Sequence, residues 1–193
     1  MYFNFTDKTD IWKGYGTSDI RQWLQQKPFL GTSIIWQQTV SKVQVRSLLG
    51  AEDSYKAPTG SLYTETDADG TNIYPSDYFY IPSVADMDSA KASDSFYKTE
   101  TISSQNYPIF STNEDRIKKL STADIESGYW TRSPSNNTYS LNRGYGVIPN
   151  NMNPDSKPAG SLQTNYQSLS GGFLYFNTAA KAAEHGILIA FSI

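Results

Sequence analysis

The six residues 129–134, Tyr-Trp-Thr-Arg-Ser-Pro, constrain the possible folds of this chain most strongly. In an extended strand, side chains alternate, so Trp130 and Arg132 lie on the same face. A tryptophan beside an arginine predicts a buried ring, with the cation stacked on a ring or bonded to a carboxylate or carbonyl. Since tryptophan is usually buried, core scaffolding is the favoured interpretation. The alternative is that Trp130 and Arg132 line a ligand site.

The chain has 193 residues, of which 38% are hydrophobic, enough for one domain over residues 1–193 with its own core. Aromatic residues make up 14% of it, and 14 of them are tyrosines. With many serines, threonines, asparagines and glycines, this composition is typical of binding surfaces. A β-rich fold with exposed strands also favours tyrosine and threonine, so both interpretations stay open.

The residue types exclude several kinds of chemistry. No cysteine is present, which excludes disulfides, thiolate catalysis and cysteine-ligated metals. His185 is the only histidine, and no glycine-rich phosphate loop is found. We therefore expect no catalytic residues, metal or cofactor. A carboxylate pair cannot be recognised from spacing alone, so an enzyme acting on polysaccharide remains a third hypothesis.

Charge and hydropathy bear on partners and location. The net charge is −3 and basic residues are scattered, so no nucleic-acid partner is expected. The first residues lack the basic and apolar regions of a signal peptide, and no apolar run is long enough to span a membrane. These features fit a particle protein that is made in a host cytoplasm.

Residues 17–27 give the clearest helix signal. Thr17 or Ser18 is a capping residue, and Pro28 ends the segment. Helical spacing predicts a buried stripe of Ile20, Trp23 and Leu24.

A second helix is predicted over residues 111–120. Ser111 and Glu114 have the spacing of a capping box, and Lys118 and Lys119 fill the last turn. Ile117 and Leu120 are expected to point inward.

Strands are predicted over residues 42–48 and 77–82 by alternation and by the proline that ends the latter. Ser83 and Asp86 then form a capping box. Residues 186–193 form an apolar segment that we expect to be buried or paired on both sides.

Two long polar segments, residues 50–77 and 135–170, are predicted to be displayed loops. Within the first, residues 67–70 (Asp-Ala-Asp-Gly) superficially resemble a calcium loop. A third acidic position and the closing glutamate are missing, so a turn is expected instead.

Several segments in order resemble an uncharacterised domain family common in Firmicutes and their phages. The segments are Ser18 to Gln25, Phe79 to Met87, Tyr107 to Phe110, Asp115 to Lys118, Tyr129 to Pro134 and Gly186 to Ile193. The resemblance covers about residues 15–193. It implies an α+β, C-type-lectin-like fold related to the formylglycine-generating enzyme. Such a fold has a small antiparallel or mixed sheet, two main helices, long polar loops and paired terminal strands.

Departures from the family limit what the resemblance implies. Ile189 stands where the family often has proline, and the calcium–sugar signatures of animal lectins are missing. Without cysteine, the oxidase chemistry of the formylglycine enzymes is not expected. Arg21, Trp23, Trp130 and Arg132 are expected to be the structural signature of the fold.

The function expected from the resemblance and the composition is that of a non-enzymatic phage virion appendage, on a tail, baseplate or head fibre. It would bind a host-surface ligand, either a glycan, which is favoured, or a protein. Loop residues proposed to bind are Asn136, Asn137, Tyr139, Tyr145 and Tyr166. A second hypothesis is a structural decoration or connector protein whose loops bind other virion subunits. In either case a homo-oligomer or a place in a large assembly is expected.

Overall fold

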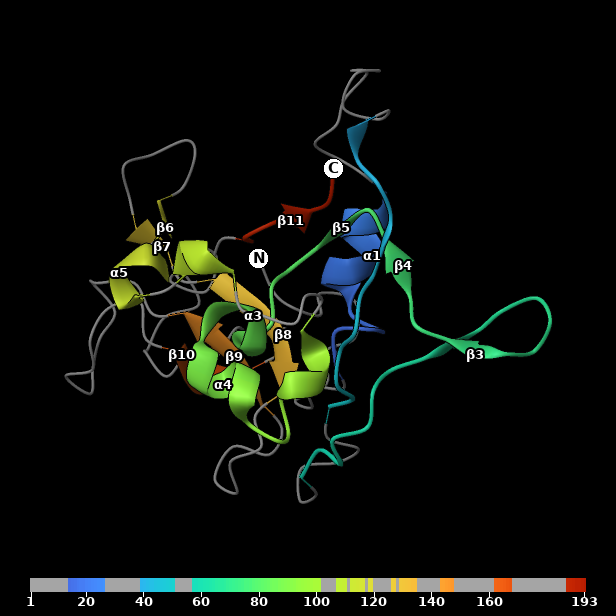
Figure 1. Ribbon diagram of the computed structural model, residues 1–193, viewed down its shortest axis with the longest axis horizontal. Coiled ribbons are helices and arrows are strands. Elements are labelled where there is room, and N and C mark those ends of the chain that lie inside the picture. Colours follow the sequence, from blue (N-terminus) through green and yellow to red (C-terminus); the bar gives the residue numbers. More distant parts are fainter. Residues whose placement is uncertain are drawn as a thin grey trace.

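The computed structural model describes residues 14–26, 39–50, 57–101, 107–110, 112–116, 118–119, 126–127, 129–134, 143–147, 162–167 and 187–193. These residues form a mixed α+β structure of short helices and small antiparallel sheets (Figure 1). The predicted α+β class is therefore confirmed. Both predicted main helices are present but short, with 7 residues in the first and 4 in the second.

The predicted first helix is present as α1, Asp19–Gln25. Ser18 caps it, since its side chain accepts a hydrogen bond from the Arg21 backbone N–H. Ile20 and Leu24 are fully buried, and Trp23 packs against the same cluster while partly exposed. The helical spacing thus predicted the buried stripe correctly.

Residues 41–50 run as an extended segment that several others join. Its strand β1, Val43–Gln44, pairs antiparallel with β4, Ser76–Asp77. Beyond β1, Leu48 bridges Leu62 and Leu49 bridges Gly14. Val45 and Ser47 are buried as the predicted alternation requires, but Leu48 on the other face is buried too.

The predicted loop over residues 50–77 contains three strands in its described part. One is β4, and the others form a hairpin of β2, Glu65–Thr66, and β3, Asn72–Ile73. The hairpin projects from the body of the molecule (Figure 1). The turn expected at residues 67–70 is confirmed: Asp67 Oδ1 accepts backbone hydrogen bonds at 3.0 and 2.8 Å, and Gly70 has a φ of 80°.

The base of this hairpin packs tightly against the loop before α1. A Cβ added to Gly16 would lie 2.2 Å from ring atoms of Tyr63, a distance at which the backbone or the ring must shift. Glycine at this position therefore permits the close approach of the tyrosine.

Strand β5, Phe79–Tyr80, leads into helix α3, Val84–Met87. The predicted capping box is confirmed: the Ser83 side chain accepts from the Asp86 N–H at 3.1 Å, and Asp86 Oδ2 accepts from the Ser83 N–H at 2.9 Å. Helix α4, Ser89–Ser93, and the 3₁₀ turns η1, Lys98–Glu100, and η2, Pro108–Phe110, follow.

The predicted strand over residues 129–134 is confirmed as β8, Tyr129–Pro134, with all six residues buried. It joins a three-stranded antiparallel sheet with β9, Arg143–Val147, and β10, Leu162–Gln167. The prediction of one continuous loop over residues 135–170 is therefore wrong where these two strands lie. Helices α3 and α4 lie in front of this sheet in Figure 1.

The second predicted helix is much shorter than expected. Helix α5 covers only Asn113–Arg116, and Lys118–Lys119 form strand β6, which pairs with β7, Glu126–Ser127. The capping hydrogen bonds are made by Thr112 and Asp115, one position later than predicted. Ser111, Ile117 and Leu120 lie outside the described residues.

The end of the chain is less buried than predicted. Strand β11, Ala190–Phe191, pairs with β5, and Ser192 bridges Ser41. Phe191 is 41% exposed and Ile193 is 81% exposed. Pairing on both sides is thus found at residues 190–192, whereas residues 187–190 are half-buried against the core clusters.

The main core lies between α1, β5 and β8. Its buried members are Tyr15, Ile20, Leu24, Val40, Val45, Phe79, Tyr80, Ile81 and Trp130. A second cluster holds Leu48, Val84, Ala85 and Tyr97, and a third holds Met87, Phe110 and Tyr129.

Candidate functional site

The loop residues predicted to bind a ligand fall mostly outside the described part of the chain. Asn136, Asn137 and Tyr139 are in this group. Tyr145 lies in β9 and Tyr166 in β10, where Tyr166 pairs with Gly144. The structure therefore brings the backbones of Tyr145 and Tyr166 together on neighbouring strands of one sheet.

Arg21 joins α1 to β4 and to the base of the hairpin. Its Nε and Nη2 donate to the two carboxylate oxygens of Asp77 at 2.8 and 2.9 Å. Its Nη1 donates to Glu65 Oε1 at 2.6 Å and to the Gly16 carbonyl at 2.8 Å. A bidentate pair of this kind orients both partners, so Arg21 fixes the strand on which Asp77 lies.

Arg132 is fully buried, and all three of its guanidinium nitrogens donate hydrogen bonds. Nε donates to the Arg46 carbonyl at 2.9 Å, and Nη1 donates to the Ile81 carbonyl at 2.8 Å. Nη1 also lies 2.7 Å from Asp86 Oδ2, and Nη2 donates to the Glu100 carbonyl. These partners lie up to 86 residues away in the sequence.

The carboxyl group of Glu100 completes this buried polar centre. Oε1 accepts from the Leu48 N–H at 2.9 Å, and Oε2 accepts from the Ser133 hydroxyl. Burial raises the pKa of Glu100 to about 7, although Arg132 and the two hydrogen bonds lower it. Desolvation of the carboxylate thus raises its pKa by more than Arg132 and the two hydrogen bonds lower it.

The side chains of this centre are buried. The side chains of Arg132 and Asp86 are 0% and 1% exposed, and Glu100 and Ser133 are 0% exposed. Every described contact of Arg132 ties one chain segment to another. The centre therefore stabilises the fold, and a ligand site is expected among exposed side chains instead.

One face of the β1–β4 ribbon displays tyrosines and cations together. The register pairs Val43 with Asp77 and Gln44 with Ser76, and a bond from the Val45 N–H to the Pro75 carbonyl continues it. Extending this register in both directions sets Lys42 opposite Tyr78 and Arg46 opposite Tyr74. We call these six side chains the outer face: Lys42, Gln44, Arg46, Tyr74, Ser76 and Tyr78.

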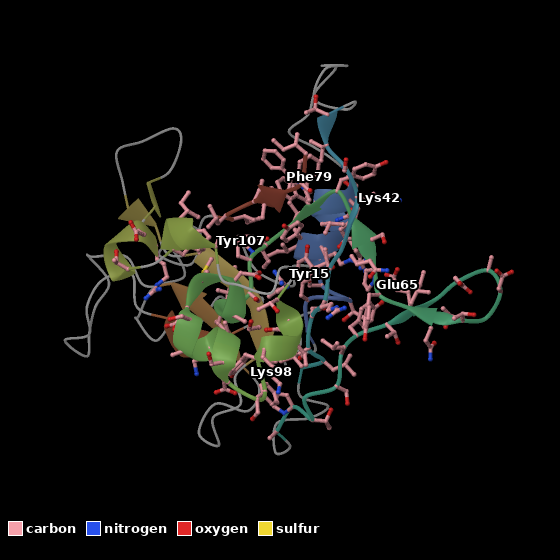
Figure 2. The ribbon with its side chains drawn as sticks, viewed as in Figure 1. Tyr15, Lys42, Glu65, Phe79, Lys98 and Tyr107 are labelled. Carbon is pink, nitrogen blue, oxygen red and sulfur yellow. The ribbon has the colours of Figure 1, made fainter. Side chains whose placement is uncertain are left out.

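The contacts across the ribbon agree with this register. Lys42 Nζ lies 5.2 Å from the ring centroid of Tyr78, and the Arg46 guanidinium carbon lies 5.3 Å from that of Tyr74. Lys42 and Arg46 are exposed, whereas both tyrosines are half-buried, and Tyr78 also packs against the main core cluster. Figure 2 shows Lys42 and Glu65 on the side of the molecule that carries the hairpin.

The opposite face of the ribbon is part of the body of the protein. Val45 and Asp77 are buried there, and Asp77 is held by Arg21. Arg21 and the core therefore fix the orientation of the outer face.

Sequence reasoning missed the outer face. The alternation of Lys42, Gln44 and Arg46 was visible, but Tyr74 and Tyr78 lay in or beside a segment predicted to be a loop. Tyr74 and Tyr78 lie two residues before and after Ser76, and this spacing was the sequence signal for a strand with both tyrosines on one face.

Two further observations concern the described residues only. They contain no group of three or more histidine, cysteine, aspartate or glutamate side chains placed to hold a metal ion. None of their helices has the length and apolar character to cross a membrane.

Comparison with protein families matches residues 4–156 to the family described as "Domain of unknown function (DUF6273)". The match covers most of the chain, so the chain belongs to this family. It includes the outer face and β8, and it ends before β10. No curated protein and no solved structure matches the chain.

Proposed function

We propose that this member of the DUF6273 family is a non-enzymatic binding domain of a phage virion appendage, such as a tail, baseplate or head fibre. Its ligand is a glycan on the host surface. The observation that carries the proposal is the outer face, where two tyrosines and polar side chains are held in a fixed array at the surface.

The chemistry of the outer face suits sugar rings. A tyrosine ring offers a flat apolar surface with little conformational entropy to lose, and its hydroxyl group remains polar. Between Tyr74 and Tyr78 lie Gln44 and Ser76, both exposed, which offer hydrogen-bond donors and acceptors. Sugars present the same alternation of apolar faces and hydroxyl groups.

Binding is favoured over catalysis because the buried charged residues make structural contacts. Arg132, Asp86 and Glu100 are occupied in joining segments of the chain. A C-type-lectin-like fold belongs to the same proposal. Its support is the α+β architecture and the burial of the Trp130–Arg132 strand that carries the resemblance.

Binding to host cells or to a glycan array tests the proposal. We expect Tyr74→Ala to weaken binding at least fivefold, because truncating an aromatic anchor typically costs more than about 1 kcal/mol. Tyr74→Phe keeps the ring and is expected to retain most of the binding. Ile109→Ala is the control, since Ile109 is 65% exposed and lies in η2.

The same assay compares the outer face with the residues predicted from sequence. Loss of binding in Tyr139→Ala or Tyr145→Ala, with Tyr74→Ala unchanged, would place the site in residues 135–170 instead. If the wild-type protein binds no host glycan at all, the proposed function is wrong.

A structural connector that binds other virion subunits is the second candidate. It is favoured by the projecting β2–β3 hairpin, whose described strands pair only with each other and where Ile73 is 39% exposed. An isolated two-stranded hairpin is marginally stable in water, so a partner would add to its order. Cross-links from this hairpin to another subunit in intact particles would favour the connector.

A further inference from the structure

We propose that the ligand of the outer face is a polyanionic glycan whose acidic groups recur at a spacing near the distance between Lys42 and Arg46. The inference rests on the proposed function for the sugar part of the ligand. The requirement for negative charge comes from a separate set of observations.

The first observation is that the two cations of the outer face have no carboxylate partner within the part of the chain that the structure describes. Among the described residues, Arg21 and Arg132 lie in ion pairs, whereas Lys42 and Arg46 contact tyrosine rings instead. Both Lys42 and Arg46 are exposed. Their charges are therefore available to an anion from solution.

The second observation is the distribution of acidic residues around the ribbon. None of the six outer-face side chains is acidic. Asp77 points to the opposite face, where it pairs with Arg21, and Glu65 pairs with the same arginine. The strand register thus separates the two signs of charge, and the outer face keeps only positive charge.

The third observation is the spacing of the cations. Lys42 and Arg46 are four residues apart on one extended segment, which corresponds to about 13 Å at ~3.3 Å per residue. A single small anion cannot contact both. A polymer with acidic groups near this spacing engages both cations, and its second contact benefits from a high effective concentration.

The tyrosine rings beside the two cations indicate that the ligand carries sugar rings between its acidic groups. Each cation stacks on a tyrosine, so an acidic group bound by Lys42 or Arg46 comes next to a ring surface. A polymer in which sugar rings alternate with phosphodiester or carboxylate groups matches this array. Phosphodiester and carboxylate groups both supply the negative charge that the cations require, and a binding assay can distinguish them.

The test measures binding of the full chain to oligosaccharides that differ in charge. The probes are a hyaluronan oligosaccharide, its carboxyl-reduced neutral form, and a glycosylated poly(ribitol phosphate). We expect at least one charged probe to bind about tenfold more tightly than the neutral one. A preference for hyaluronan identifies carboxylate as the recognised group, and a preference for the phosphate polymer identifies phosphodiester.

Charge-removing variants locate the site. Lys42→Gln and Arg46→Gln should each weaken binding of the preferred charged probe about fivefold, the effect of roughly 1 kcal/mol for an exposed ion pair. The Arg46 carbonyl that accepts from Arg132 is backbone, so Arg46→Gln keeps this contact. Lys98→Gln is the matched control, since Lys98 is exposed and lies well apart from Lys42 (Figure 2).

Four outcomes would overturn the inference. Equal binding of neutral and charged oligosaccharides would contradict the inference but not the proposed glycan function. Unchanged affinity in both Gln variants would do the same. Equally tight binding of single-stranded poly(dT) would show that the face recognises polyanions without regard to sugar. If no probe binds and host cells are not bound either, both the inference and the proposed function fail.

Discussion

At the scale of single residues, Glu100 decides how stability responds to pH. Its carboxyl group is fully buried, and its pKa is raised from 4.5 to about 7. Between these values the unfolded chain releases the proton while the folded chain keeps it. Rising pH therefore favours the unfolded state over this range, and the effect levels off above pH 7.

We predict that this contribution lowers the free energy of unfolding by about 3 kcal/mol between pH 4.5 and pH 7, at 1.36 kcal/mol per pKa unit. Other groups also titrate, so the wild-type protein is compared with Glu100→Gln in urea unfolding at each pH. Glutamine keeps an acceptor for the Leu48 N–H and cannot ionise. Two curves that stay parallel from pH 4 to pH 8 would contradict the assignment.

At the scale of elements, Arg132 joins β8 to several segments that precede it in the chain. It bonds the carbonyls of Arg46, Ile81 and Glu100 and pairs with Asp86 in α3. A lysine carries the same charge but lacks the planar set of donors. Arg132→Lys therefore leaves several buried carbonyls without partners.

We predict that Arg132→Lys destabilises the protein by about 3–5 kcal/mol, the usual cost of breaking a buried ionic network. Chemical denaturation measures this loss. Arg46→Lys is the control, because the Arg46 side chain is exposed and contacts only a tyrosine ring among the described residues. Similar stability for the two variants would show that Arg132 does not hold these elements together.

The elements that could be predicted from sequence are those with local signals. Ser18 and the apolar spacing after it define α1, and Ser83 with Asp86 defines the start of α3. Strand β8 was recognisable from its own residues. For the two helices the necessary hydrogen bonds involve neighbours in the sequence.

The elements that were missed depend on pairing with a strand outside their own segment. Strands β9 and β10 are rich in glycine and polar residues, and β9 lies between β8 and β10, pairing with both. The strand at Lys118–Lys119 exists because it pairs with β7, which outweighs the helical signal before it. The outer face escaped prediction for the same reason, since its tyrosines and cations come from two separate segments.

At the scale of the whole molecule, buried and exposed charges have different roles. Arg21 and Arg132 hold the core, β4 and the hairpin base in place. The outer face lies on the other side of the β1–β4 ribbon, where its cations remain exposed. This separation would let the residues that we propose to bind the ligand vary without loss of the fold.

Hydroxyl-radical footprinting of the full chain, read by mass spectrometry, tests the central claim most directly, namely that the outer face binds a host glycan. Tyrosine side chains at a surface oxidise, and a bound ligand slows the reaction. With purified host-surface glycan added, we predict a severalfold slower oxidation of Tyr74 and Tyr78, with no change at the exposed Ile109. Unchanged oxidation of both tyrosines under conditions where the glycan is bound would contradict the account.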